Sequence, residues 1–368
     1  MYYFSFHNPV TACVGRGRSE EIESYCLGQR VLLLSDAVVS TLPQYQKIKG
    51  LLGDKVAAEY TGILPNPESG MVDQILQLLD RANVDCVIGI GGGSTLDTAK
   101  LVASIAGENV PVEEYLNGMA LPRRKMPLVL MPTTSGTGSE VTNIAVITSG
   151  ATHKKVALAN DVLYCDIAVI DPELTATVPA KVTASTGFDA LCHALEALWS
   201  TNATPPSDAL AAGAIGRITA NLEQACAGAP NAREEMAVAS YLAGLAFNQT
   251  RTNACHANSY YLTTNYHVDH GSACAVTIIP FLKYNLSAVR EKVDGVARQC
   301  GFTDGERLIL ELERIHRNVG LKERLSDYGV TAGDIEPMVD AILANQTSFL
   351  NPAPITRESM SRFLTDLL

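Results

Sequence analysis

The chain has 368 residues, of which 47% are hydrophobic and 18% are charged, and its formal net charge at pH 7 is -11. A chain of this length and composition is typical of a folded protein with two domains. The negative charge argues against nucleic acid as a partner. No apolar run approaches the length of a membrane span, and the N-terminus lacks the basic and apolar regions of a signal peptide.

Nine cysteines are scattered along the chain, and none belongs to a Cys-x-x-Cys pair. An odd and dispersed set is typical of reduced thiols, not of a disulfide framework or a zinc ribbon. Cys192 and Cys255 each neighbour a histidine, and we interpret both as buried structural thiols. The sequence therefore predicts a cytoplasmic protein.

The first half of the chain alternates short apolar runs with helical patterns. The helical patterns cover residues 69–83 and 94–107, and the strand-like runs are VLLLSD (31–36), VDCVIGIGGGS (84–94), PLVLMPTTSGTGSE (127–140) and DIAVIDP (166–172). Such alternation predicts a mostly parallel sheet that is covered by helices on both faces.

The strand signals stop after about residue 180. Long stretches rich in Ala, Leu and Glu follow, and these predict a helical domain. The segment PELTATVPAKVTAS (172–185), with two prolines, is the expected joint. We therefore expect an α/β domain over residues 1–180 and an all-helical domain over residues 181–368.

A glycine-rich turn joins the strand-like run at 84–91 to the helix after it. Gly92 and Gly93 let the backbone approach a phosphate closely, and Ser94 opens a helix whose first amides bind anions. Asp97 follows on that helix. Because the segment lacks the last glycine of the dinucleotide fingerprint, a turn without a ligand stays an alternative.

A second polar loop, MPTTSGTGSE (131–140), also follows a strand-like run. It offers Thr133, Thr134 and Thr137, with glycines at 136 and 138 for flexibility. Ligands bind at the carboxyl ends of strands in open α/β sheets. The two loops together predict a nucleotide site.

Asp36 ends the run VLLLSD. A carboxylate at a strand end beside a nucleotide can bind a ribose 2′-hydroxyl and would repel a 2′-phosphate, which favours NAD over NADP. A helix N-cap or turn residue is an equally good interpretation of Asp36.

An acid and an imidazole stand four residues apart in GFDALCHALEA (187–197). Asp189 and His193 therefore share one face of an otherwise apolar helix. A buried ionised carboxylate needs a partner. The pair is either a simple Asp–His contact or two ligands of a metal ion.

Three of the seven histidines crowd into residues 253–272. On one unbroken helix His256 and His270 would lie about 21 Å apart, too far to share an ion. The chain must therefore fold back, and residues 265–269 form a plausible turn. With Asp189 and His193 they would give one carboxylate and three imidazoles, which suits Fe²⁺ or Zn²⁺.

At these residues the chain resembles the iron-containing, or group III, alcohol dehydrogenases over essentially its full length. The resemblance is carried by several specific motifs: FHNPV near the start, GIGGGSTLDTAK (89–100), MPTTSGTGSEVT (131–142), DPELTATVP (171–179), TGFDALCHALEA (186–197) and the segment from His256 that ends HGSACAVTIIPFLKYN.

The resemblance implies a nucleotide-binding α/β domain with a dehydroquinate synthase-like partner domain of helices, and an active site in the cleft between them. It implies metal ligands at Asp189, His193, His256 and His270. It also implies NAD(H) contacts at Asp36, Asn66, Gly92, Gly93, Ser94, Asp97, Thr133, Thr134, Thr137 and Lys155.

Two positions depart from the family pattern. Many members carry a further histidine four residues after the third ligand, where this chain has Tyr260, and most have proline before the last ligand, where it has Asp269. Ser259 and Tyr260 together look closer to the branch that reduces phosphonoacetaldehyde and sulfoacetaldehyde. Arg251 could pair with an anionic substrate or be a solvated surface charge.

The expected activity is hydride transfer between NAD(H) and a small alcohol or aldehyde, with the metal acting as a Lewis acid. Tyr260 and His267 are candidates for passing the proton to water, and His267 is more simply a turn residue. The alternatives are a reductase specific for a small anionic aldehyde, a dehydroquinate-synthase-like lyase, a metal-free maleylacetate reductase and a non-catalytic nucleotide-binding protein. A homodimer is expected because closed dimers are the commonest oligomers.

Overall fold

A computed structural model describes residues 4–123 and 126–368. Contacts divide the chain into two compact units. The sheet unit comprises Asn8–Thr134 and Gly138–Thr177, and the helical unit comprises the described residues up to His7, Ser135–Thr137 and Val178–Leu368. Three residues of the polar loop at 131–140 thus belong to the helical unit, which the sequence did not suggest.

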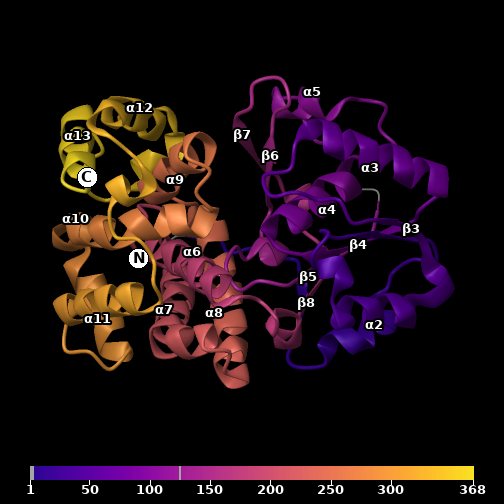
Figure 1. Ribbon diagram of the computed structural model, residues 1–368, viewed down its shortest axis with the longest axis horizontal. Helices are drawn as coiled ribbons and strands as arrows, with labels where there is room; N and C mark the ends of the chain where they lie inside the picture. The colour runs from indigo at the N-terminus through magenta and orange to yellow at the C-terminus, as the bar shows by residue number, and fades with distance from the viewer. Residues whose placement is uncertain (1–3, 124–125) are drawn as a thin grey trace. The chain divides into compact units, whose positions relative to one another are not determined.

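The sheet unit is built on six parallel strands (Figure 1). Their order across the sheet is β1-β8-β5-β4-β2-β3. The strands are β1 (Thr11–Val14), β2 (Val31–Leu34), β3 (Val56–Tyr60), β4 (Cys86–Gly91), β5 (Leu128–Pro132) and β8 (Ile167–Ile170). A separate antiparallel hairpin consists of β6 (Ile144–Thr148) and β7 (Lys155–Ala159).

Helices connect these strands. They are α1 (Ile22–Tyr25), α2 (Pro43–Leu52), α3 (Ser69–Ala82), α4 (Gly93–Ile105) and α5 (Val112–Leu116). Short 3-10 turns lie at Arg18–Glu21, Val39–Thr41, Gly53–Lys55, Ser139–Val141, Asp161–Leu163 and Pro172–Thr175. Every residue of β2, β4 and β5 is buried, as expected for central strands that are covered on both faces.

The order of the strands creates a switch point between β2 and β4. From β2 the chain moves outward to β3 and then returns to β4 on the other side of β2, after which it continues to β5. Ligands bind at such a point, outside the carboxyl ends of the strands. The segments that follow β2, β4 and β5 hold most of the residues that the sequence predicts as cofactor contacts, while Asn66 follows β3 and Lys155 begins β7.

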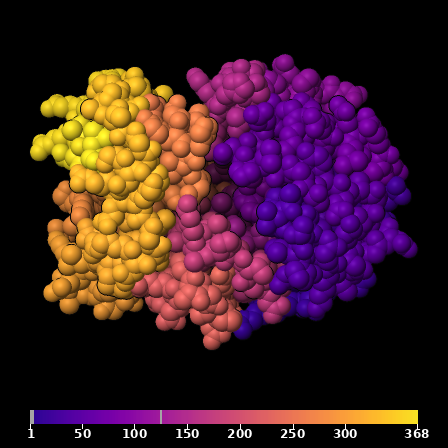
Figure 2. Space-filling view, in the orientation of Figure 1, coloured from indigo at the N-terminus to yellow at the C-terminus, as the bar shows by residue number. Residues whose placement is uncertain are grey.

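The helical unit contains no strand among its described residues. Its helices are α6 (Ala180–Trp199), α7 (Pro205–Cys226), α8 (Pro230–Thr250), α9 (Ala254–Asn265), α10 (His270–Gln299), α11 (Gly305–Asn318), α12 (Ile335–Ala344) and α13 (Arg357–Thr365). Residues of the C-terminal helices, in yellow, lie at the surface of this unit (Figure 2). The predicted combination of a parallel α/β domain with an all-helical domain is confirmed.

Helix α6 is the centre of the helical unit. It packs against α7, α8 and α10, and nearly all its residues from Thr183 to Trp199 are buried. A helix that is buried on nearly every face belongs in a core. Its composition of Ala and Leu supplies both helix propensity and small, closely packing side chains.

Helix α10 is the one described helix that is long and apolar enough to cross a membrane by length and composition. The expectation that no segment would approach this length was therefore wrong. The protein itself buries 72% of the apolar window, so α10 has the character of a core helix.

Candidate active site

Helix α6 carries three polar side chains on one face. Asp189, His193 and Glu196 follow one another at spacings of four and three residues, so they stack along the helix. Their exposed fractions are 2%, 5% and 0%. Charged side chains are almost never this deeply buried without partners, so neighbouring helices must supply them.

Helices α9 and α10 supply two imidazoles. Helix α9 ends at Asn265 and α10 begins at His270, so the predicted turn between them is confirmed. His267 lies in this turn with a φ of 54°. The fold-back brings the ring centroids of His256 and His270 to within 5.5 Å of each other.

The two imidazoles converge on Asp189. Its Oδ1 lies 3.5 Å from Nε2 of His256 and 3.5 Å from Nε2 of His270. Cys274, one turn along α10, places its Sγ 3.9 Å from Nε2 of His270. The ligand atoms of these four residues all lie within 4.8 Å of one another. Ligands bound tetrahedrally at about 2.1 Å from one ion are about 3.4 Å apart, so the spacing suits a shared ion.

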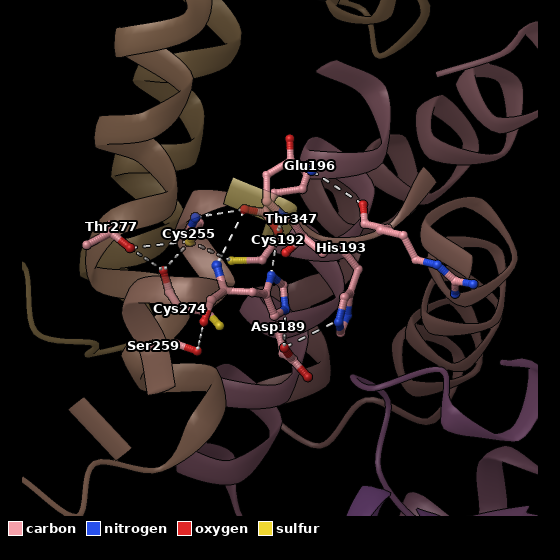
Figure 3. A network of polar contacts seen from close by, with 12 residues as sticks. Asp189, Cys192, His193, Glu196, Cys255, Ser259, Cys274, Thr277 and Thr347 are labelled. Carbon is pink, nitrogen blue, oxygen red and sulfur yellow. Dashed lines mark hydrogen bonds and ion pairs between the residues drawn. The ribbon is translucent and has the colours of Figure 1, made fainter. Parts of the chain in front are cut away.

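Glu196 holds His256 in the orientation that the cluster needs. Its Oε2 lies 2.6 Å from Nδ1 of His256, so the imidazole donates there and turns Nε2 toward Asp189. The same carboxylate accepts the backbone N–H groups of Asn253 and Cys255 at 2.8 Å each. One buried side chain thus accepts two backbone N–H groups at the start of α9 and also orients the histidine of that helix, in the network of polar contacts that Figure 3 shows.

Ser259 plays the corresponding part for His270. Its Oγ lies 3.5 Å from Nδ1 of His270 and donates to the carbonyl of His256 at 2.7 Å. Both histidines therefore keep Nδ1 toward a protein partner and Nε2 toward Asp189, as is usual for imidazoles that bind metals.

The start of α10 gives a structural role to Asp269, which stands where most members of the family pattern have proline. Its carboxylate caps the helix by accepting the N–H of Ser272 at 3.1 Å and also accepts the hydroxyl of Ser185 on α6. A Cβ on Gly271 would lie 2.1 Å from the carbonyl oxygen of Ser185. Glycine is therefore needed for α10 to approach α6 closely enough to bring His270 to Asp189.

His193 lies beside this cluster, but its nitrogens are not among the four grouped ligand atoms. Its Nδ1 is 3.3 Å from the carbonyl oxygen of Gly136 and 3.8 Å from Oδ1 of Asp189. Its ring stacks on Phe247 and His256 at centroid distances of 4.0 and 4.4 Å. Burial lowers the pKa of His193 to about 4, so its imidazole is neutral.

Electrostatics make the cluster attractive to a cation. Burial opposes ionisation of Asp189, but His193, His270 and His256 outweigh it and keep the pKa of Asp189 below its usual value. Burial likewise opposes the charged form of His256, but Cys274, Glu196 and Asp189 outweigh it and raise its pKa well above the usual value. Anionic groups are thus balanced by protons on imidazoles, which a divalent ion would displace.

Two atoms in the cluster lack the partners that burial demands. Oδ1 of Asp189 and Nε2 of His256 are buried and make no hydrogen bond within the described residues. Orphaned buried polar atoms are rare because each costs about 1–3 kcal/mol. A metal ion bound between them would satisfy both, so the residues present fit a metal.

The cofactor loops meet at the carboxyl ends of β4 and β5. Gly91 pairs with Pro132, and the N–H of Thr133 donates to the carbonyl of Gly91 at 3.0 Å. Helix α4 begins at Gly93 with no side-chain cap. Its first amides are therefore available for a phosphate.

Other predicted cofactor residues surround this turn. A Cβ on Gly92 would lie 3.7 Å from Oγ1 of Thr134, and the N–H of Asn66 donates to Oγ of Ser94 at 3.3 Å. Thr137, by contrast, belongs to the helical unit. Lys155 begins β7, where it pairs with Thr148.

Two predicted acidic cofactor residues have structural partners. Oδ1 of Asp36 accepts the N–H groups of Val38 and Val39 at 2.9 Å each. The turn role that the sequence left open for Asp36 is thus present, at the end of the strand next to β4.

Asp97 ties helix α4 to the second loop. It accepts the hydroxyl of Ser139 at 2.6 Å and the N–H of Val146 at 2.9 Å, and Nζ of buried Lys100 lies 3.6 Å from it. These contacts give Asp97 a role in holding the loop.

Glu140, in the second loop, provides a pH-dependent prediction. Burial raises its pKa to about 7. The folded state therefore binds a proton that the unfolded state releases between about pH 4.5 and 7, so Glu140 lowers stability as pH rises through this window. We expect Glu140→Gln to be up to about 3 kcal/mol more stable than the parent at pH 8, with little difference at pH 4.5.

Urea unfolding at both pH values measures this difference in stability. Exposed Glu114→Gln is the control, and an equal effect of Glu140→Gln at both pH values would contradict the prediction.

The predicted proton-transfer residues differ in position. The ring of Tyr260 stacks on that of His270 at a centroid distance of 6.3 Å. His267 is exposed in the turn, without a described contact to the cluster. Arg251 follows α8 with a φ of 68°.

Sequence reasoning missed Glu196 and Cys274, and it connected Ser259 with the choice of substrate and not with the orientation of a histidine. Glu196 stands in the stretch that raised the metal hypothesis, seven residues after Asp189, where the next turn of that face must lie. Cys274 follows His270 by four residues, the same spacing that drew attention to Asp189 and His193. Ser259 lies three residues after His256. Helical spacing from each histidine would have found all three.

Comparisons with known proteins agree along the chain. Residues 9–172 match the iron-containing alcohol dehydrogenase family, and residues 183–368 match the C-terminal part of the Fe-containing alcohol dehydrogenase family. Long-chain-alcohol dehydrogenase 1 of Geobacillus thermodenitrificans is 37% identical over 80% of this chain and 78% of its own length. NAD-dependent methanol dehydrogenase of Bacillus methanolicus is 29% identical over 99% of this chain and 100% of its own length.

Solved structures extend the likeness to three dimensions. Sulfoacetaldehyde reductase from Bifidobacterium kashiwanohense, in complex with NAD⁺, has a TM-score of 0.95 at 31% identity and covers 100% of this chain and 99% of its own. A 1,3-propanediol oxidoreductase has a TM-score of 0.94 at 30% identity, with both chains covered completely. The chain belongs to the iron-containing alcohol dehydrogenase family and is a metal-dependent, NAD-linked alcohol dehydrogenase.

Proposed function

We propose that this enzyme interconverts small aldehydes and alcohols with NADH and NAD⁺, and that Fe²⁺ or Zn²⁺ occupies the cluster around Asp189. The observation that carries the proposal is the convergence of Nε2 of His256 and Nε2 of His270 on Oδ1 of Asp189, each at 3.5 Å. Two of these three atoms are buried without a hydrogen bond. Carboxylate and imidazole ligands suit either ion.

When bound, the metal supplies Lewis acidity toward the substrate oxygen and the nicotinamide supplies or accepts the hydride. The chain's residues hold and orient these groups. Glu196 and Ser259 fix the imidazoles, while Gly92, Gly93 and the first amides of α4 receive the phosphates. Tyr260, stacked on His270, carries the hydroxyl that we favour for exchanging the proton with water; His267 is the second choice because it lies exposed in the turn.

Asp36 is expected to set the preference for NADH over NADPH. Its carboxylate follows β2, the neighbour of β4, and would repel a 2′-phosphate. Asp36→Ser keeps a side-chain oxygen for the turn but removes the charge. We expect the ratio of kcat/KM for NADH to that for NADPH to fall by at least about tenfold. An unchanged ratio, with Asp54→Ser as control, would show that Asp36 serves only the turn.

Steady-state NADH oxidation tests the proposed function. The enzyme is stripped of metal, reloaded with Fe²⁺ or Zn²⁺, and assayed with propionaldehyde, butyraldehyde and glycolaldehyde. Activity that disappears on stripping and returns on reloading supports the proposal. Activity that is unaffected by the metal, or turnover without net oxidation of NADH as in a lyase of the dehydroquinate-synthase type, would refute it.

A second candidate is a reductase specific for a small anionic aldehyde. Sulfoacetaldehyde reductases are among the relatives, at 31% and 33% identity, and Arg251 lies two residues before Asn253, the N-cap of α9. Adding sulfoacetaldehyde and phosphonoacetaldehyde to the same assay distinguishes the two. A strong anionic preference that Arg251→Gln abolishes would favour this candidate. The homodimer and the cytoplasmic location stay predictions from the sequence.

A further inference from the structure

We propose that Glu113, on α5, is a positioning residue for the cofactor: it anchors the turn of the β6–β7 hairpin and thereby places Lys155 beside the phosphate site. The inference rests on the proposed function, because it assumes that Lys155 contacts NAD(H). Glu113 itself lies outside both polar loops that the sequence connects with the cofactor.

The β6–β7 hairpin needs support from its surroundings. It consists of two strands of five residues each, and it forms a sheet of its own beside the six parallel strands. A two-stranded hairpin is only marginally stable by itself in water. Lys155 is the first residue of β7, so the contacts of the turn before it decide where its side chain begins.

Glu113 holds this turn with both carboxylate oxygens. One oxygen accepts the hydroxyl of Ser149, the first residue after β6, and the other accepts the hydroxyl of Ser69 at 2.8 Å. Oγ of Ser69 in turn accepts the N–H of Gly150 at 3.0 Å. Hydrogen bonds from Ser149 and Ser69, and from the backbone of Gly150 and Ala151, lower the pKa of Glu113. The contacts are therefore made to an ionised acceptor, which forms the stronger class of hydrogen bond.

Ser149 connects the carboxylate with the start of β7. Its N–H donates to the carbonyl of Lys154 at 2.9 Å, and its Oγ accepts the N–H of Thr152 at 3.0 Å. The side chain of Ser149 is buried, so its hydroxyl is fixed between the turn and Glu113. A displacement of Ser149 would therefore move the start of β7 and Lys155 with it.

Helices α3 and α5 give the carboxylate a fixed base. The N–H of Val112, the first residue of α5, donates to Asp73 on α3 at 3.0 Å. Tyr115 and Leu116, on the same short helix as Glu113, are buried. The turn of the hairpin is thus tied to two helices that are packed against each other (Figure 1).

The strand opposite Lys155 contacts the phosphate turn. Thr148 is the direct partner of Lys155, and opposite residues of an antiparallel pair project their side chains to the same face. Oγ1 of Thr148 donates to the carbonyl of Asn66 at 3.4 Å, and the N–H of Asn66 donates to Oγ of Ser94 at 3.3 Å. The side chain of Lys155 therefore leaves the hairpin on the face that adjoins the start of α4, where an ammonium group would favour an anionic cofactor.

The test is fluorescence titration of the full-length, metal-loaded enzyme with NADH. Glu113→Gln keeps the size of the side chain but removes the charge and turns an NH₂ group toward its donors. We expect the dissociation constant of NADH to rise by about tenfold, while kcat at saturating NADH and aldehyde stays within about twofold. Glu114→Gln, an exposed neighbour on α5, should bind NADH as the parent does.

A double-mutant cycle separates positioning from a general loss of stability. Lys155→Met should also weaken NADH binding, and adding Glu113→Gln to it should weaken binding no further, because there is then no ammonium group to place. Ser149→Ala removes only one hydroxyl that the carboxylate accepts, and it should show the same dependence on Lys155. This second variant provides the test if Glu113→Gln does not fold, which circular dichroism checks.

Each outcome decides a separate point. Unaltered NADH binding in folded Glu113→Gln and Ser149→Ala would overturn the inference. An effect of Glu113→Gln that persists in full in the Lys155→Met background would also overturn it, because Glu113 would then act by another route. Failure of the parent to bind NADH would overturn the proposed function itself.

Discussion

Asp189→Asn is expected to abolish stoichiometric metal binding and to lower kcat/KM for aldehyde reduction by about a thousandfold. Asn has the same shape but no charge, so the cation loses the carboxylate on which both imidazoles converge. A thousandfold loss corresponds to about 4 kcal/mol, the several kcal/mol that a Lewis acid contributes to charge stabilisation in a transition state. Metal analysis after gel filtration and steady-state NADH oxidation measure the two effects.

The control for this substitution is Asp208→Asn. Asp208 lies in the same unit and pairs with Lys292 at 2.9 Å, but it has no contact with the metal cluster among the described residues. It should keep both metal and activity. If Asp189→Asn kept one metal per chain and full kcat, the cluster around Asp189 would not be the metal site.

Glu196→Ala is expected to destabilise the protein by about 3–5 kcal/mol and to weaken metal binding by about 10–100-fold. The substitution removes the acceptor for two backbone N–H groups at the start of α9 and for Nδ1 of His256. The imidazole would then be free to rotate away from Asp189. Urea unfolding and Zn²⁺ titration against a competing chelator measure the two quantities.

A conservative variant separates orientation from stability. Glu196→Gln keeps one acceptor oxygen and the size of the side chain but turns an NH₂ group toward buried N–H donors, so it should lose less stability than Glu196→Ala and still bind Zn²⁺ more weakly. Glu223→Gln, which loses a surface pair with Arg314, should leave both the stability and the Zn²⁺ affinity unchanged. Unaltered Zn²⁺ affinity in a folded Glu196→Gln would show that this carboxylate only caps α9.

The fold was predictable because its signals are local. Parallel strands buried on both faces appear as unbroken apolar runs, and β4 and β5 lie within the runs predicted at 84–94 and 127–140. The helical half shows the 3.6-residue period and no strand pattern. The assignment of Ser135–Thr137 to the helical unit could not be predicted, because it depends on packing such as that of Gly136 against Thr186.

The residues of the candidate site were likewise predictable where the signal is local and not predictable where it depends on packing. The pair Asp189 and His193 was visible because both lie on one helix, and the turn before His270 followed from the distance that two ligands can span. The orientations of the His193 and Cys274 side chains were not visible. They depend on where a side chain turns inside the core, here toward Gly136 in one case and toward His270 in the other.

The buried polar face of α6 has a consequence for the lifetime of the protein. A ligand that binds the native state but not the unfolded chain adds stability in proportion to the logarithm of its concentration, about 4 kcal/mol at a thousand times its dissociation constant. Because this face lies at the centre of the helical unit, the ion acts on the folding equilibrium of the core that surrounds it. Scarcity of metal would then increase the unfolded fraction that proteases remove, so the amount of enzyme in a cell would follow the supply of its metal.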